Sequence, residues 1–168
     1  GIFSSHIFSE PSEDMNVEAF GPMGFATFSP SEARDLVCLV GGSGIAGIMS
    51  VLKQAEAVNH FKRHKLFMVF GARRIEDLFF LSELASLRAT APDNISIHIA
   101  LSDQIDGHEL PDIIHDLPAH QGFVHDVAQT VGGDEFMSGR LAFIGGPPQM
   151  LNSCIASLLS SGLPVSDI

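Results

Sequence analysis

The sequence is poor in basic residues, which limits the partners it can bind. Nine lysines and arginines stand against 20 aspartates and glutamates, and the formal net charge is −11 at neutral pH. A chain this acidic is repelled by nucleic-acid phosphates and by anionic lipid headgroups. The balance argues against nucleic acid or an anionic membrane as the main partner.

Cysteine is also scarce. Cys38 and Cys154 are too few for a disulfide framework and lack the spacing of a metal site. Each lies in an apolar segment, so we expect two buried thiols in a cytoplasmic protein. The chain starts at Gly1 with neither an initiator methionine nor a basic leader, so we expect a fragment or a processed chain without a signal peptide.

Apolar runs are long but interrupted. Residues 36–52 and 141–166 carry no charge, yet glycines break the first run and a GGPP sequence breaks the second. A membrane-spanning helix needs about 20 continuous apolar residues. Both runs are more typical of a strand, a turn and a helix, so we expect no membrane span.

The 168 residues are 45% hydrophobic, enough for one domain with a proper core. From residue 36 onward, strand-like and helix-like segments alternate. The predicted strands are 36–40, 66–70, 95–100 and 141–144. The predicted helices are 48 to about 60, 75–89, 122–130 and 149–161. This alternation predicts an open parallel sheet with helices on both faces.

Two segments do not follow the alternation. Residues 17–20 and 25–28 are short alternating runs around a turn, and we expect strands there. Residues 102–121 are polar and we interpret them as a long loop. Four histidines lie within or just after this loop, at His108, His115, His120 and His125. Their mixed spacing on a loop favours solvated side chains over a metal site, and we expect no metal. We assign no function to His98 or the other histidines.

Residues 36–51 read LVCLVGGSGIAGIMSV, a buried strand that runs into a glycine cluster and then into a helix. The exposed N–H groups of a helix start can bind a pyrophosphate. We expect a side chain at Gly44 to obstruct that phosphate and to require a forbidden φ. Gly42, Gly44 and Gly47 match G-x-G-x-x-G, but the usual acidic residue after the second strand is replaced by Arg73 and Arg74. The sequence therefore indicates a nucleotide-binding fold other than the ordinary dinucleotide one.

Four motifs in order resemble the ferredoxin reductase superfamily of flavin- and nicotinamide-dependent electron-transfer proteins. Residues 41–46 (GGSGIA), 71–78 (GARRIEDL), 122–126 (GFVHD) and 145–150 (GGPPQM) match its G-G-[ST]-G-I-A, G-x-R, G-x-V-x-D and C-G-P-P-x-M. Residues 21–25 (GPMGF) resemble the junction with the flavin barrel. The overall set resembles reductase components of bacterial oxygenases.

The resemblance implies a ferredoxin reductase-type NAD-binding domain over residues 34–168. Residues 1–33 would be the C-terminal remnant of an FAD-binding barrel and a linker. The implied NAD-binding residues are Gly42, Ser43, Gly44, Ile45, Arg73, Asp103, Gly146, Pro147 and Met150, and the implied FAD contacts are Gly1 and Ser4. The implied activity is electron transfer from NADH through FAD to an iron–sulfur acceptor, either a ferredoxin or an oxygenase component.

The chain departs from the family at two points. It has no R-x-Y-[ST] flavin motif and no tyrosine or tryptophan at all. We therefore expect FAD to need a flavin domain elsewhere in the same polypeptide, and this chain alone to purify colourless. Gly145 stands where the family has the cysteine near the nicotinamide, so the catalytic residue is unknown.

Asp103 lies where NADPH-using relatives tend to carry arginine. A carboxylate there accepts from a free 2′-OH and repels a 2′-phosphate, so we expect NADH to be the coenzyme. An ordinary loop acid is the simpler alternative for this residue.

Two other functions stay open. One is a regulatory subunit that binds a nucleotide or another ligand in the same fold without hydride chemistry. The other is a different Rossmann-like enzyme such as a methyltransferase, against which the missing acid after the second strand counts.

Overall fold

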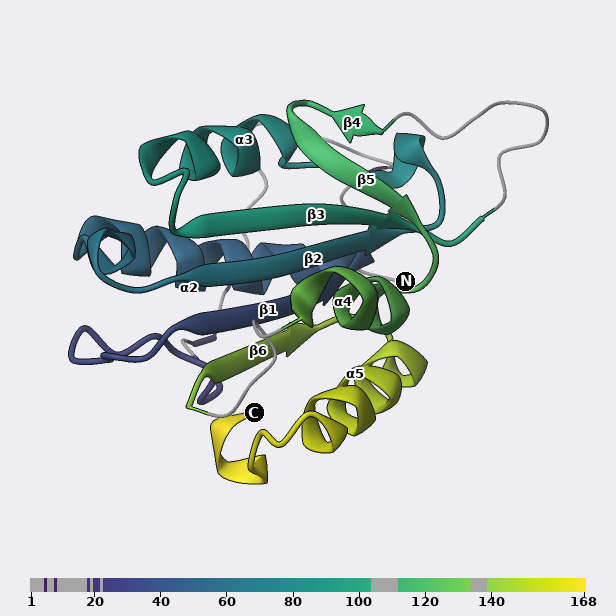
Figure 1. Ribbon diagram of the computed structural model, residues 1–168. Coiled ribbons are helices and arrows are strands. Elements are labelled where there is room, and N and C mark those ends of the chain that lie inside the picture. Colours follow the sequence, from purple (N-terminus) through teal and green to yellow (C-terminus); the bar gives the residue numbers. More distant parts are fainter. Residues whose placement is uncertain are drawn as a thin grey trace.

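The fold has three layers, with one sheet between two pairs of helices (Figure 1). The computed structural model describes residues 23–103, 112–133 and 139–168, together with the single positions 5, 8, 18, 20 and 21. The predicted alternation of strands and helices from residue 36 onward is confirmed in outline.

The sheet has six strands in the order β4-β5-β3-β2-β1-β6. They are β1 (Leu36–Gly41), β2 (Leu66–Ala72), β3 (Ile95–Leu101), β4 (Ile113–Ile114), β5 (Leu117–Gln121) and β6 (Leu141–Gly145). All neighbours are parallel except β4, which is antiparallel to β5. Val40 is in register with Phe70 on one side and Gly145 on the other, so the carboxyl ends of these strands share one edge. Ligands of parallel sheets bind at that edge.

Helices cover both faces of the sheet. They are α2 (Ile45–Ala57), α3 (Leu81–Thr90), α4 (Val124–Gly132) and α5 (Pro148–Ser160), with short 3-10 turns η1 (Gly42–Gly44), η2 (His60–Lys62), η3 (Ile75–Asp77) and η5 (Val165–Asp167). α2 and α3 lie on one face, and α4 and α5 on the other (Figure 1). The central strands β1 and β2 are therefore covered from both sides.

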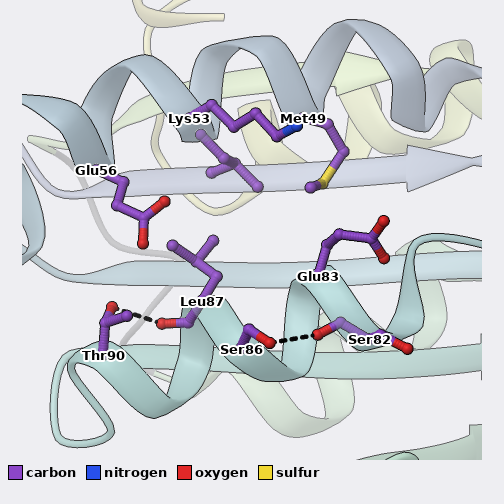
Figure 2. Close-up of a pocket in the computed structure, with 9 residues that line it drawn as sticks. Met49, Lys53, Glu56, Ser82, Glu83, Ser86, Leu87 and Thr90 are labelled. Atoms are coloured by element: carbon purple, nitrogen blue, oxygen red, sulfur yellow. Dashed lines mark hydrogen bonds between the residues drawn. The ribbon is translucent and has the colours of Figure 1, made fainter.

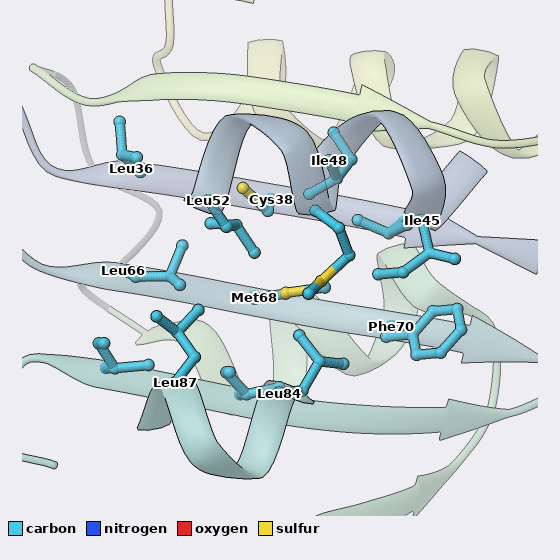
Figure 3. Close-up of a cluster of buried hydrophobic side chains, with 14 of the residues drawn as sticks. Leu36, Cys38, Ile45, Ile48, Leu52, Leu66, Met68, Phe70, Leu84 and Leu87 are labelled. Atoms are coloured by element: carbon cyan, nitrogen blue, oxygen red, sulfur yellow. The ribbon is translucent and has the colours of Figure 1, made fainter. Parts of the chain in front are cut away.

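The core is divided into two clusters by the alternation of strand side chains. Cys38 of β1 faces the α2 and α3 side, whereas its neighbours Val37 and Leu39 face α4 and α5. Figure 3 shows the first cluster, where Leu52 of α2 and Leu84 of α3 pack over the sheet. Because β1 is buried on both faces, its sequence is continuously apolar rather than alternating.

Helix α3 begins later than its sequence predicts. Only residues 75–77 form a 3-10 turn, Leu78 is extended, and α3 starts at Leu81. Phe80 interrupts the predicted helix with a left-handed φ of 60°. At this break, the Phe79 ring packs edge-on against the Phe70 ring, with 6.0 Å between the ring centres.

Two further expectations about secondary structure are wrong. The predicted loop over residues 102–121 contains β4 and β5, and β5 extends the sheet beyond β3. Conversely, the described residues 25–28 form no strand. Phe28 is instead buried against the edge of the His60 ring, at 5.0 Å between ring centres. The predicted strand over 17–20 falls partly outside the described residues.

Candidate functional site

The glycine cluster after β1 forms a tight turn into a helix. Gly42 has a φ of 51°, a left-handed conformation that glycine adopts without strain. Ser43 is exposed at the outside of the turn. No side chain in the described part of the chain caps the start of α2, although the Ile45 N–H already donates to the Gly42 carbonyl within the turn.

A second glycine turn lies beside the first, after the neighbouring strand β6. A Cβ added to Gly44 would overlap the Gly145 carbonyl carbon and lie 2.6 Å from the Gly146 nitrogen. The two turns therefore touch backbone to backbone. α5 starts directly after the second turn, with Pro147 at its N-cap. The starts of α2 and α5 thus open at the same sheet edge, as the motif order predicts.

Met150 packs against both turns. A Cβ on Gly41 would overlap the Met150 sulfur, and one on Gly146 would lie 2.9 Å from it. The half-buried thioether is therefore in contact with the glycine backbones that form the turns. A direct contact between Met150 and NAD stays a prediction.

The next strands along the same edge carry a small charge cluster. Arg73 Nε lies 3.5 Å from one Asp103 carboxylate oxygen, and Arg74 Nε lies 3.4 Å from the other. The Asp103 N–H also donates to the Arg73 carbonyl at 3.0 Å. The arginine side chains are 79% and 70% exposed, against 24% for the aspartate. The carboxylate is thus held between two guanidinium groups that solvent and ligands can reach.

An exposed aromatic residue, not among the predicted site residues, follows the strand that is tied to this cluster. The Gln121 amide donates to the Asp103 carbonyl at 3.3 Å, which ties the end of β5 to the Asp103 loop. Two residues later Phe123 is 61% exposed, with its ring stacked on His125 at 5.9 Å and 19°. Such a flat apolar surface suits a stacked base. The only signal in the sequence was its place in GFVHD.

The two thiols of the chain are buried, which limits their reactivity. Burial raises the pKa of Cys38 to about 12, and the pKa of Cys154 to about 12 for the same reason. Both stay protonated and unreactive at neutral pH. Gly145 offers no replacement for the family cysteine, since a Cβ there would lie 2.9 Å from the Gly44 carbonyl oxygen.

The other residues and features considered in the sequence have different outcomes in the structure. Gly1, Ser4 and His108 lie outside the described residues, as does the rest of 104–111. Within the described ranges, no three His, Cys, Asp or Glu side chains gather in a geometry that could hold a metal ion. His120 is not on a solvated loop, because it lies half-buried on β5. No described helix is long and apolar enough to cross a membrane.

A hollow of about 330 Å³ lies away from this edge, between α2 and α3 (Figure 2). Met49, Leu52 and Leu87 form much of its apolar surface. Two of the hydroxyls beside it are already used, because Ser86 donates to the Ser82 carbonyl and Thr90 to the Leu87 carbonyl. Three charged side chains, Lys53, Glu56 and Glu83, also line the hollow (Figure 2).

Comparison with known proteins agrees with the geometry of the sheet edge. The family model for the oxidoreductase NAD-binding domain matches residues 38–155. The reductase component DmpP of phenol 2-monooxygenase from Pseudomonas sp. strain CF600 is 32% identical over 152 residues, which cover 90% of this chain and 40% of DmpP. The ferredoxin–NAD(+) reductase component of the alkene monooxygenase system from Xanthobacter autotrophicus is 28% identical, over 93% of this chain and 44% of that protein. The chain thus spans less than half the length of these relatives.

Solved structures show the same fold. The Amycolatopsis cytochrome P450 reductase GcoB superposes with a TM-score of 0.71 at 22% identity, over 88% of this chain and 41% of GcoB. The ferredoxin reductase in carbazole 1,9a-dioxygenase superposes with a TM-score of 0.67 at 23% identity, over all of this chain and 46% of that one. The predicted fold class is confirmed.

Proposed function

The chain belongs to the oxidoreductase NAD-binding domain family, and from that premise we propose that it binds NADH within a larger flavin-dependent reductase. In this proposal, electrons pass from NADH through FAD to an iron–sulfur acceptor, a ferredoxin or an oxygenase component. The sequence relatives named above, which are oxygenase reductase components, support this choice of acceptor. Residues 34–168 are the proposed NAD-binding domain, and residues 1–33 the end of the flavin domain and its linker.

One observation carries the proposal, namely the contact between the two glycine turns. The helix starts of α2 and α5 open side by side at the carboxyl edge of β1 and β6. The turn from Gly42 to Ile45 would hold the pyrophosphate with backbone N–H groups. Gly146 and Pro147 would face the nicotinamide half. Nicotinamide and flavin supply the hydride and electron chemistry when bound, so the residues of this chain bind and orient.

The proposed site for the adenosine half of NADH lies after β2 and β3, the next two strands of the sheet from β1. There Asp103 would accept a hydrogen bond from the 2′-OH of the ribose, while Arg73 would reach a phosphate or the ribose. We add Phe123 to this site, with its exposed ring as the stacking surface for adenine. Its exposure and its link to the Asp103 loop through Gln121 support the assignment.

The phosphate turn is tested by placing a carboxylate on it. Ser43→Glu adds a negative charge on the exposed outside of the turn, and we expect NADH affinity to fall at least tenfold, or about 1.4 kcal/mol. Ser50→Glu is the matched control, since Ser50 is also exposed but lies further along α2. Calorimetric titration of both variants with NADH gives the answer. Equal affinities in wild type and Ser43→Glu, with an intact fold, would remove the pyrophosphate from this turn.

A regulatory subunit without hydride chemistry is the alternative, and Gly145 in place of the family cysteine favours it. The two functions separate in the intact gene product. The reductase requires a flavin absorption spectrum that NADH bleaches under anaerobic conditions, whereas a regulatory subunit shows NADH binding with no flavin reduction.

A further inference from the structure

Two histidines that the proposed function does not use lie against each other on adjacent strands. His98 Nδ1 of β3 is 3.0 Å from His120 Nε2 of β5, and the ring centres are 5.1 Å apart at 43°. Both side chains are half-buried on a rigid sheet rather than on a loop. The contact is a hydrogen bond, so one of the two nitrogens carries the proton between them; when that proton moves to the other nitrogen of its own ring, both facing nitrogens become possible metal ligands.

The orientation of His98 is fixed from its other side. The Ser96 hydroxyl lies 2.9 Å from His98 Nε2, and the Phe67 ring flanks the imidazole at 5.7 Å. When Nε2–H donates to Ser96, the lone pair of Nδ1 points toward His120. A partner on the second ring nitrogen is the usual support of a metal-binding histidine, because it sets both tautomer and ring angle.

Both rings are neutral at neutral pH. Burial, with smaller contributions from His120 and Arg88, lowers the pKa of His98 to about 4. Burial also lowers the pKa of His120. Neutral imidazole is the form that binds metals, so a metal requires no net loss of protons at pH 7; it requires the His120 proton to move from Nε2 to Nδ1 when His98 Nε2–H donates to Ser96.

We propose that His98 and His120 form a two-histidine site for a first-row divalent transition-metal ion, with water in the remaining positions. Zn²⁺ is the probe of choice. Zn–N bonds of about 2.0–2.1 Å at a tetrahedral angle need the two nitrogens roughly 3.3 Å apart. The present 3.0 Å therefore has to widen by a few tenths of an ångström, and both rings have to turn about their soft imidazole torsions so that the two nitrogens are directed at the ion instead of at each other.

Arg88 is the charged group that acts on this pair, and it opposes a bound cation. Its guanidinium donates to the Asp116 carbonyl at 2.7 Å, which holds it on the turn before β5. Its positive charge contributes to the lowered pKa of His98, so its field reaches the imidazole. Removing that charge should tighten metal binding, whereas a variant that merely disturbs the fold should weaken it.

The site is separate from the proposed NADH residues but shares their strands. β5 joins β3 through only three register pairs, from Ile99–Ala119 to Leu101–Gln121. A metal bridging His98 and His120 would fasten these strands just behind the Asp103 loop. We therefore expect Zn²⁺ to raise the thermal stability of the chain.

The experiment is a calorimetric titration of the 168-residue chain with Zn²⁺ at pH 7.5 in a non-coordinating buffer. Wild type should bind one equivalent at a saturable site. His120→Gln and His98→Gln should each weaken that binding at least tenfold, whereas His115→Gln, which changes an exposed histidine on the neighbouring turn, should match wild type. Arg88→Gln should bind more tightly than Arg88→Lys. Cu²⁺ should bind more tightly than Zn²⁺, following the usual order for nitrogen ligands.

Circular dichroism and thermal denaturation without added metal show whether each variant is folded, and His120→Gln is the decisive one because its ring is the less buried of the two. Wild type without a saturable Zn²⁺ site would overturn the proposal. So would folded His120→Gln with wild-type Zn²⁺ affinity. A result in which His115→Gln loses as much affinity as His120→Gln would also overturn it, since the ion would then be bound elsewhere.

Discussion

Gly44 and Gly145 lie backbone to backbone, which makes each of them a steric requirement of the other. A Cβ on Gly44 would lie 2.5 Å from the Gly145 carbonyl oxygen, and a Cβ on Gly145 would lie 2.9 Å from that of Gly44. The expectation of a forbidden φ at Gly44 is wrong, because its φ is −58° and Gly42 is the residue in the left-handed region. A Gly44 side chain would collide with the second turn, so loss of NADH binding in Gly44→Val would report a disturbed fold.

The same contact gives a prediction for the missing family cysteine. Gly145→Cys restores the family residue but forces its Cβ against the backbone of Gly44, which cannot give way as a flexible side chain would. We expect the free energy of unfolding to fall by about 1–3 kcal/mol, as for other overpacked sites. Urea denaturation followed by circular dichroism measures this.

Gly47→Ala is the matched control for that variant. Gly47 lies in the first turns of α2, and a Cβ there would have no described atom within 4 Å. Alanine should raise the free energy of unfolding by about 0.5–1 kcal/mol, since glycine is unfavourable inside a helix. A stable, unchanged Gly145→Cys would mean that the two turns separate more easily than their contact implies.

A second prediction concerns the choice of coenzyme. In Asp103→Ser the negative charge that repels a 2′-phosphate is removed, and Arg73 and Arg74 lose the carboxylate that they now share. Both guanidinium groups then become available to a phosphate. We expect NADPH affinity relative to NADH to rise about 5- to 150-fold, or about 1–3 kcal/mol.

Titration of wild type and variant with each coenzyme tests this. Asp93→Ser is the control, because Asp93 is an exposed acid before β3, at the opposite end of that strand from Asp103. It removes the same charge without touching the arginines, so its coenzyme ratio should match wild type. An Asp103→Ser variant that still discriminates as wild type does would take Asp103 out of coenzyme selection.

The sequence predicts the strands of this fold well where they are buried on both faces, and poorly where they are only partly buried. β1 is buried on both faces, and its uninterrupted apolar run identified it at once. β5 is short, lies toward the sheet margin and reads LPAHQ, so neither alternation nor apolar content marked it as a strand. Its place depends on contacts with β3, among them His98–His120, which join residues 22 positions apart.

The sequence likewise predicted some parts of the candidate site and missed others. Local glycine motifs predicted both turns, because the backbone conformation of a turn is encoded in adjacent residues. The sequence also selected Arg73 and Asp103, but their ion pair exists only because β2 and β3 are neighbours in the sheet. Phe123 was missed since exposure of an aromatic ring is a tertiary property.

A third prediction follows from the pKa of His98, which burial lowers to about 4. In the unfolded chain this group takes up its proton near pH 6.5. The unfolded state thus binds more protons between pH 4 and 6.5, and stability rises with pH across that window. As pH falls from 6.5 to 4, His98 should remove about 1–2 kcal/mol from the free energy of unfolding, allowing for solvent screening.

The check is a set of denaturation curves at several pH values. His98→Gln should give a shallower dependence on pH between 4 and 6.5 than wild type, with the contribution of buried His60 remaining in both. A His98→Gln curve as steep as that of wild type would show that His98 titrates normally.

The last prediction tests whether Phe123 stacks on the adenine of NADH. Its ring is 61% exposed, two residues after the Gln121 side chain that donates to the Asp103 carbonyl, so shortening it should cost binding energy rather than core packing. Stacking of a base on an aromatic ring contributes about 1–3 kcal/mol, so Phe123→Leu should weaken NADH binding about 5- to 150-fold. Phe123→Trp keeps a stacking surface and should bind within about twofold of wild type.

The composition makes this variant a reporter as well. Since the chain has no tryptophan or tyrosine, Trp at position 123 would be its only strong fluorophore, and bound NADH should quench it. Val165→Trp is the control for adding an indole, because Val165 is 73% exposed on η5, after the end of α5. It should leave NADH affinity unchanged. Wild-type affinity in Phe123→Leu, together with unquenched fluorescence in Phe123→Trp, would place the adenine elsewhere along the edge.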